Sequence, residues 1–224
     1  MRSSLAAIRA ILWKDLTAEW RSRELLSSML VFALLVVMIF NFALELDAQT
    51  RESVTAGVLW TTFTFAGTIG LNRSMASERD SGCLDGLLLA PVDRSIIYFG
   101  KLGGNFLFIL VVEAVVLPLY SFLFGVNVFQ PGLLPVLLLG SFGYAAVGTL
   151  LAVMAVQVRT RDILLPILLF PLVLPVLIAA VKASQGALAG LPVGQYASWI
   201  NLLVAYDVIF AALAWMVFDY VVEE

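Results

Sequence analysis

Two carboxylates lie near the middle of long apolar segments of the sequence. Glu113 lies within residues 99–124, and Asp207 lies within residues 199–218. A charged side chain at the centre of a lipid bilayer costs about 2.5–3.5 kcal/mol on insertion scales, and such residues commonly mark functional sites. We therefore expect Glu113 and Asp207 to take part in transport. The alternative, which the residues leave open, is a neutral acid hydrogen-bonded to a neighbouring helix.

Other residue types that carry chemistry are scarce. The chain of 224 residues has no histidine and one cysteine, Cys83. Histidine is the commonest metal ligand, a frequent haem ligand and the usual base of a serine triad, so we expect no metal site, no stably bound cofactor and no catalytic centre. The phosphate-binding pattern G-x-x-x-x-G-K-[ST] is also absent, so the energy for any energy-dependent work would come from a partner.

The most specific local pattern is LNRSMASERDSGCLDGLLLAPVDRSIIYFGK, residues 71–101. Its centre predicts a short helix that begins at an N-cap, Asp80 or Ser81, and ends at Pro91. One face of this helix carries leucines: Leu84, Leu87 and Leu88. A short helix with an apolar ridge and charged flanks can dock into a groove of a soluble protein, or it can pack on the membrane surface.

Six apolar segments account for most of the chain. They are residues 25–44, 53–71, 99–124, 132–156, 163–181 and 199–218. Hydrophobic residues make up 62% of the sequence, against about 45–50% in a soluble domain. Each segment is close to the roughly 20 residues that a helix needs to span a bilayer. The sequence therefore predicts an all-α, polytopic integral membrane protein with six transmembrane helices in a single domain, residues 1–224.

The basic residues predict the orientation of these spans. With the N-terminus in the cytosol, all but two of the 13 lysines and arginines are cytosolic, and the exceptions are Arg51 and Lys182. Cytosolic loops of membrane proteins carry an excess of basic residues. We therefore expect both termini in the cytosol. Acidic residues precede the first apolar run, which is unlike a cleavable signal peptide, so we expect that run to be retained as a span.

Residues 1–24 predict an interfacial amphipathic helix ahead of the first span. Apolar side chains recur at spacings of three or four: Leu5, Ile8, Leu12, Leu16 and Trp20. Tryptophan and basic residues suit the headgroup region of a membrane. We expect this helix to lie on lipid as an anchor, and the open alternative is an elbow helix that also contacts a cytosolic partner.

The fifth span contains three prolines, Pro166, Pro171 and Pro175. Each proline removes a backbone donor and clashes with the preceding turn, so we expect these residues to break the helix and bend it around another part of the molecule. The open alternative is a merely kinked helix. Neighbouring helices or cavity water would then satisfy the freed carbonyls. The glycine-containing segment after it, residues 182–198, predicts a short helix or partial re-entry at the outer interface.

The loop pattern resembles a known class of membrane protein. The order E-R-x-x-G-x-L-x-x-L-L-x-x-P-x-x-R in residues 78–94, followed by Gly100-Lys101 at the start of a span, resembles the coupling-helix region of ABC-2-type permeases. Within that class the chain most resembles the CcmB family, the haem exporter B subunit of cytochrome c maturation. The six-span length, the run GVLWTTFTFAGTIGLNRSMASERDSG in residues 57–82, and the proline-containing run DILLPILLFPLVLPVLIAA in residues 162–180 all match.

The resemblance implies a set of partners in the bacterial cytoplasmic (inner) membrane. A CcmA-like ATPase would bind ATP and Mg²⁺, and a CcmC-like haem-handling membrane protein and a CcmE-like haem chaperone would hold the cargo, haem. A second copy of the chain is expected, because one ATPase dimer needs two docking helices. Nucleic acid is not an expected partner.

The resemblance also implies which residues contact the ATPase. The coupling loop would be residues 72–98, between the second and third spans. The contact residues carried over from the motif are Glu78, Arg79, Asp80, Gly82, Leu84, Leu87, Leu88 and Pro91. Two other functions stay open. One is an ABC-2 permease that exports another substrate, such as a lipid or a drug, and the other is a membrane scaffold of an assembly complex without a transport role.

Overall fold

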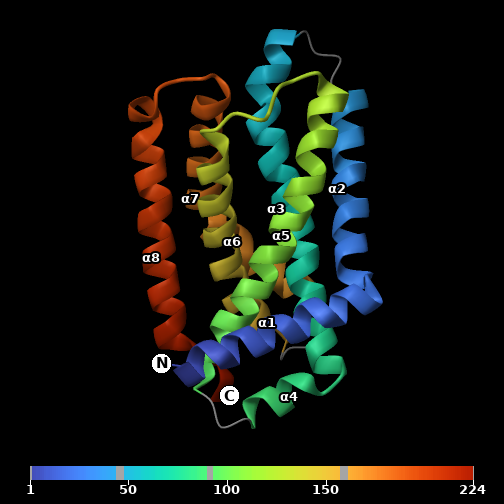
Figure 1. Cartoon of the computed structure of the whole chain (residues 1–224), viewed down its shortest axis with the longest axis vertical. Helices are drawn as coiled ribbons and strands as arrows, with labels where there is room; N and C mark the ends of the chain where they lie inside the picture. Colours follow the sequence, from blue (N-terminus) through green and yellow to red (C-terminus); the bar gives the residue numbers. More distant parts are fainter. Residues whose placement is uncertain (1, 44–47, 90–92, 157–160, 224) are drawn as a thin grey trace.

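The computed structural model describes residues 2–43, 48–89, 93–156 and 161–223, which form eight helices and no strand (Figure 1). The helices are α1 (Arg2–Ser22), α2 (Glu24–Ala43), α3 (Ala48–Asp80), α4 (Cys83–Leu88), α5 (Arg94–Phe124), α6 (Leu133–Val156), α7 (Arg161–Leu188) and α8 (Val193–Glu223). Six of them, all except α1 and α4, are long and apolar enough to cross a membrane. The predicted all-α, six-span fold is confirmed.

The six long helices form an upright bundle, and α1 lies across one end of it (Figure 1). The short helix α4 and both chain termini are at the same end. We call this end, with α1 and α4, the α1 face. Among the described residues, it carries the basic residues that the sequence places in the cytosol, and the opposite end carries Lys182 near the end of α7.

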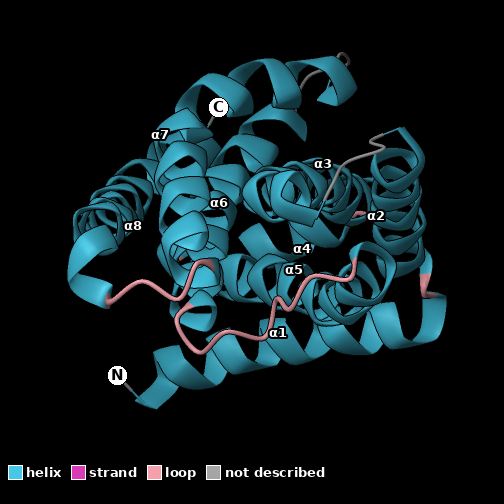
Figure 2. Ribbon diagram, turned by 90° about the horizontal axis from the view of Figure 1, so that it is seen from above, coloured by secondary structure: helices cyan, strands magenta, loops and turns pink. Residues whose placement is uncertain are grey.

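The bundle is arranged around two central helices, α3 and α6 (Figure 2). The buried share of the most apolar stretch is 72% for α3 and 78% for α6. The same share is only 22% for α2 and for α8. The outer helices direct large apolar side chains away from the bundle, including Phe42, Val208 and Met216. Those side chains suit a lipid environment.

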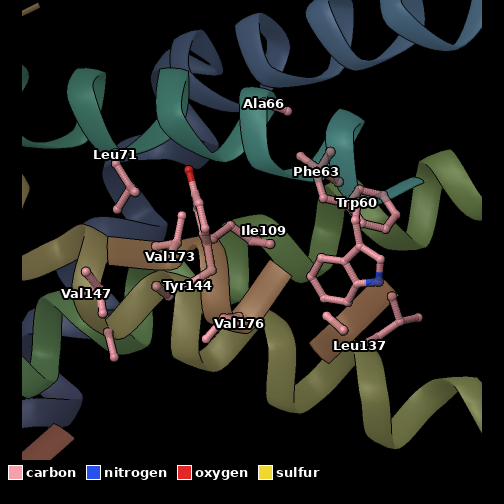
Figure 3. Close-up of a cluster of buried hydrophobic side chains, with 14 of the residues drawn as sticks. Trp60, Phe63, Ala66, Leu71, Ile109, Leu137, Tyr144, Val147, Val173 and Val176 are labelled. Atoms are coloured by element: carbon pink, nitrogen blue, oxygen red, sulfur yellow. The ribbon is translucent and has the colours of Figure 1, made fainter. Parts of the chain in front are cut away.

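Glycines allow α3 and α6 to approach closely. A Cβ built on Gly140 of α6 would lie 2.2 Å from the Trp60 ring of α3, and one on Gly67 of α3 would lie 2.7 Å from the Tyr144 ring of α6. The Tyr144 hydroxyl donates to the Thr64 carbonyl at 2.8 Å, and Figure 3 shows Trp60 and Tyr144 within the buried cluster. Small residues opposite large ones are a common way for membrane helices to pack.

The turn between α1 and α2 is stabilised by Glu19, which is buried. Its carboxylate accepts hydrogen bonds from the backbone N–H groups of Leu25 (3.3 Å) and Leu26 (2.8 Å), in the first turn of α2. A carboxylate at a helix N-terminus satisfies free donors and interacts favourably with the helix dipole. Arg23, in the turn itself, has a left-handed backbone (φ 54°). Glu19 therefore caps the start of α2.

The predicted helix before the first span is present, but its apolar stripe is divided between two environments. Ile11, outside the predicted stripe, is buried against α5, whereas Leu5 and Trp20 of the stripe are exposed. Trp13 is also exposed. α1 therefore has one side in contact with the bundle and another that presents large apolar side chains, which suits the membrane interface.

The prediction that prolines break the fifth span is wrong. Pro166, Pro171 and Pro175 all lie inside the continuous helix α7. A neighbouring helix supplies one hydrogen bond, because the Tyr206 hydroxyl of α8 donates at 2.8 Å to the carbonyl of Leu172, three residues before Pro175. Membrane helices accommodate proline where adjacent side chains bond to the exposed carbonyls in this way.

The predicted separate helix or re-entry in residues 182–198 is also wrong. α7 continues to Leu188, and a tight turn leads directly to α8. Gly190 has φ 68°, its N–H donates to Ala187 O, and the N–H of Leu191 donates to Gly186 O. This is the Schellman pattern that ends a helix. The glycines therefore terminate α7 and do not begin another element.

Candidate functional site

The predicted docking loop begins with an extension of α3 beyond the predicted end of its span. α3 continues to Asp80, and α4 then occupies Cys83–Leu88. Gly82 has φ 67°, and its N–H donates to Arg79 O at 3.0 Å. The predicted helix start at Asp80 or Ser81 is wrong, because Asp80 is the last residue of α3 and the left-handed Gly82 separates the two helices.

The residues predicted to contact an ATPase are placed differently from one another. Arg79, Asp80 and Gly82 are exposed at the α1 face. Leu87 is half-buried against the core, and Glu78 faces the interior. Leu84 and Leu88 belong to α4, and Pro91 lies outside the described residues. Leu89, which the sequence pattern did not single out, is 87% exposed. The ATPase contact itself stays a prediction.

Glu78 belongs to a network of four charged residues that joins three helices. Its Oε1 atom is 2.5 Å from Lys14 Nζ of α1 and 2.7 Å from Lys101 Nζ of α5. Lys101 also donates to both carboxylate oxygens of Asp15 at 2.9 Å. The Lys101 side chain is 2% exposed and that of Asp15 is 9% exposed, so these pairs are shielded from solvent. We call Lys14, Asp15, Glu78 and Lys101 the α1-face charge network.

The charge state of Lys14 follows from this network. Burial lowers the pKa of an amine, but the hydrogen bond from Lys14 to Glu78 and the charges of Asp15 and Glu78 outweigh it, and the pKa of Lys14 is raised. Lys14 is therefore fully protonated at neutral pH.

A sequence signal for the network existed, although the predictions did not use it. Lys101 lies in the run GKLGG, and its glycines allow α1 to approach α5: a Cβ on Gly100 would lie 2.8 Å from Ile11, and one on Gly104 would lie 3.3 Å from Asp15. A lysine among glycines at the start of a span indicates a helix crossing that must supply an acidic partner.

Glu113 of α5 lies inside the bundle. It is 2% exposed and accepts a hydrogen bond from the Ser141 hydroxyl of α6. A second side-chain pair joins the same two helices, because Asn105 donates to the Thr149 hydroxyl at 3.0 Å. Glu113 therefore forms a polar contact between α5 and α6.

Asp207 of α8 is buried and has a different environment. Both of its carboxylate oxygens lack a hydrogen-bond partner within the described residues. It faces α6 at Gly143, where an added Cβ would lie 2.3 Å from Asp207 Oδ1. Gly143 therefore provides the space that this side chain occupies. In the described part of the chain, no group of histidine, cysteine, aspartate and glutamate side chains is arranged to hold a metal ion.

The six-span bundle, with a surface helix and a short loop helix at one end, defines a multi-pass membrane protein. Residues 6–223 match the family described as CcmB protein, and the chain belongs to that family. It is 28% identical over 181 residues to Heme exporter protein B of Pseudomonas aeruginosa, covering 80% of this chain and 81% of that protein. Heme exporter protein B of Paracoccus denitrificans is 28% identical over 188 residues, covering 82% and 84%. The same-named protein of Rhodobacter capsulatus is 27% identical over 189 residues, covering 83% and 86%.

Proposed function

We propose that the chain is the membrane permease subunit of an ABC transporter that delivers haem for c-type cytochrome biogenesis. The observation that carries this proposal is the family match over residues 6–223, together with relatives of nearly equal span that are named Heme exporter protein B. A CcmA-like ATPase supplies the energy, and CcmC-like and CcmE-like proteins hold the haem. The complex is located in the inner membrane and contains two copies of this chain.

The α1 face supports the part of the proposal that concerns the ATPase. α3 projects beyond its apolar stretch, and α4 lies at the same end of the bundle as α1 (Figure 1). Arg79, Asp80 and Leu89 are exposed there. A short helix with an apolar residue and charged neighbours is suited to a groove on a soluble partner. Under this proposal α4 docks on the ATPase and moves when ATP is bound and hydrolysed.

A charge reversal at the α1 face tests ATPase docking. Arg79→Glu should reduce co-purification of the CcmA-like ATPase at least fivefold, because an exposed cation would be replaced by an anion in the contact. Lys182→Glu makes the same change at the opposite end of the bundle, at another exposed residue, and should leave co-purification unchanged. Equal recovery of the ATPase with both variants would contradict docking at Arg79.

A deletion strain tests the cargo. Loss of covalent haem-bearing c-type cytochromes, restored by the wild-type gene and not by Arg79→Glu, is the expected result. Normal cytochromes in the deletion strain would instead favour an ABC-2 exporter of a lipid or a drug. Cytochrome loss without any effect of the chain on ATP hydrolysis by the partner would favour a scaffold.

The two buried acids are tested separately, because their contribution to transport is also a proposal. Glu113→Gln retains a group that can accept from Ser141, and Asp207→Asn retains the shape of a side chain whose oxygens have no described partner. If transport uses a proton or charge on either acid, the corresponding variant should lower cytochrome formation at least fivefold at normal protein level. Wild-type formation with both variants would show that the acids serve only packing.

A further inference from the structure

Two groups of helices meet at the α1 face, and each group has close contacts of its own. α1 packs on α5 where Gly100 allows Ile11 to approach (Figure 2). α4 follows α3 through a short turn closed by the bond from Gly82 N–H to Arg79 O. α1 is therefore expected to move with α5, and α4 with the end of α3.

A cavity of about 500 Å³ lies between these two groups. Ala18 and Ser22 of α1 line one side, and Ser74 and Ser77 of α3 line the other. Protein interiors are normally close-packed, and a packed contact transmits force by direct apposition. Here the two walls face each other across open space, so that the end of α3 has room to shift relative to α1.

Glu78 links the two sides of this cavity through ion pairs. It lines the cavity, and its Oε1 atom contacts both Lys14 of α1 and Lys101 of α5. Its other oxygen, Oε2, is buried and has no hydrogen-bond partner in the part of the chain that the structure describes. A carboxylate between two ammonium groups can change its distance to each while remaining paired. Charge-assisted bonds are about twice as strong as neutral ones, so such a bridge can carry force across a gap.

We propose that the α1-face charge network is the joint through which movement of α4 reaches α1 and α5, with Glu78 as its positioning residue. The proposal rests on the proposed function, which makes α4 the docking helix of an ATPase. It adds a specific route: the docked partner shifts α4 and the end of α3 across the cavity relative to α1, and the changed distances from Glu78 to Lys14 and Lys101 reposition α1 and the start of α5. Asp15 holds Lys101 in place for this contact.

A reversible tether across the cavity tests whether the two walls move. In a Cys83→Ser background, Ala18→Cys and Ser77→Cys place one thiol on each wall, and both natural side chains are exposed. The complex with the ATPase, in lipid nanodiscs, is treated with a cleavable bifunctional maleimide. We expect the tether to lower, at least fivefold, the stimulation of the partner's ATP hydrolysis by this chain. A reductant that cleaves the linker should restore that stimulation. The two single-cysteine variants, treated identically, should keep full stimulation.

A charge deletion tests Glu78 itself. Glu78→Gln preserves size and hydrogen bonding, so we expect ATPase co-purification within twofold of wild type and a fall of at least fivefold in cytochromes formed by the complemented deletion strain. The matched control is Glu24→Gln, since Glu24 lines the same cavity but its side chain is 79% exposed and its ion pair with Arg73 is long, at 3.9 Å. The control should retain normal cytochrome formation.

The outcomes separate the joint from the proposed function. If the wild-type chain does not retain the ATPase, the proposed function fails and the joint fails with it. If the wild-type complex forms and the tethered complex is fully stimulated, the joint alone is overturned. Loss of ATPase co-purification with Glu78→Gln would also overturn it, because Glu78 would then be a docking contact. Blocked stimulation by the tether, with retained binding and lowered cytochrome formation by Glu78→Gln, supports the joint. Normal cytochrome formation by Glu78→Gln overturns it.

Discussion

The α1 face and the centre of the bundle bury polar side chains in different ways. At the α1 face, Lys101 is 2% exposed and contacts two carboxylates. At the centre, Tyr144 is buried with neutral hydroxyl and carbonyl partners, and its ring lies against Gly67. The first region joins helices by charge beside a cavity, and the second joins them by direct contact through glycines.

This difference shows which parts of the molecule are suited to movement. Glycine contacts such as those of Gly140 with Trp60 fix the spacing of α3 and α6, because no space remains between them. Ion pairs tolerate changes in distance that close packing does not, since electrostatic attraction falls off gradually. The comparison therefore predicts a rigid pair of central helices and an adjustable connection at the α1 face.

Removal of the buried lysine should have the largest effect on stability. Lys101→Met would leave Asp15 and Glu78 with the partly exposed Lys14 as their cationic partner, and breaking a buried ion pair costs up to about 3–5 kcal/mol. The measurement is the free energy of unfolding in detergent. A matched apolar substitution at the exposed Arg79 should cost much less. A loss below about 1 kcal/mol for Lys101→Met would show that charge does not hold the α1 face.

A methyl group at the closest glycine contact tests the centre of the bundle. Gly140→Ala places a Cβ 2.2 Å from the Trp60 ring, and overpacking of this kind costs about 1–3 kcal/mol. Thermal unfolding monitored by size-exclusion recovery is the measurement. Gly57→Ala in α3 is the control, because nothing lies within 4 Å of its added Cβ. Equal melting temperatures for the two variants would refute the close approach of α3 and α6.

Loss of the cap at the start of α2 should have an intermediate effect. Glu19→Ala removes the acceptor of the Leu25 and Leu26 N–H groups, and loss of a helix cap typically costs about 1 kcal/mol. Thermal unfolding measures the loss, and Glu19→Gln, which keeps an acceptor, should recover part of it. Identical melting temperatures for Glu19→Ala and wild type would contradict the capping role.

Lys14 should contribute least, because its side chain is 38% exposed and solvent screens its pairs. Lys14→Met should cost about 1 kcal/mol or less. The raised pKa of Lys14 gives the sign of the pH dependence: its contribution is complete below the ordinary value of 10.5 and is lost as pH rises through the folded-state pKa. Unfolding free energies of wild type and Lys14→Met should therefore differ at pH 8 and converge above pH 10.5. A difference that grows with pH would contradict this assignment.

The spans were predictable from sequence, whereas their ends were harder to place. The length of the apolar segments identified all six spans. α3 nevertheless continues to Asp80, well beyond its apolar stretch, because the left-handed Gly82 and not hydropathy sets that end. The prolines of α7 misled the prediction for a related reason. A sequence shows that Pro175 lacks a donor, but not that Tyr206 of another helix bonds to a nearby carbonyl.

The candidate site was predictable as a region and not as a set of contacts. The motif located the α1-face loop, but Glu78 and Arg79, which are adjacent in sequence, face opposite environments. The partners of Glu78 lie 64 and 23 residues away, as the numbers of Lys14 and Lys101 show. Periodicity reports which residues share a face of one helix, and it carries no information about which other helix lies opposite that face.

The packing of α1 on α5 has a consequence for biogenesis. Residues near Ile11 are synthesised before α5, but their contact at Gly100 lies on α5, which follows α2 and α3 in the chain. During synthesis of the first two spans, α1 has no α5 to receive it, and its exposed Trp13 and Trp20 are the side chains that can hold it at the lipid surface. Docking of α1 is thus a late step of membrane insertion, and the α1-face charge network can close only once α5 has entered the bilayer.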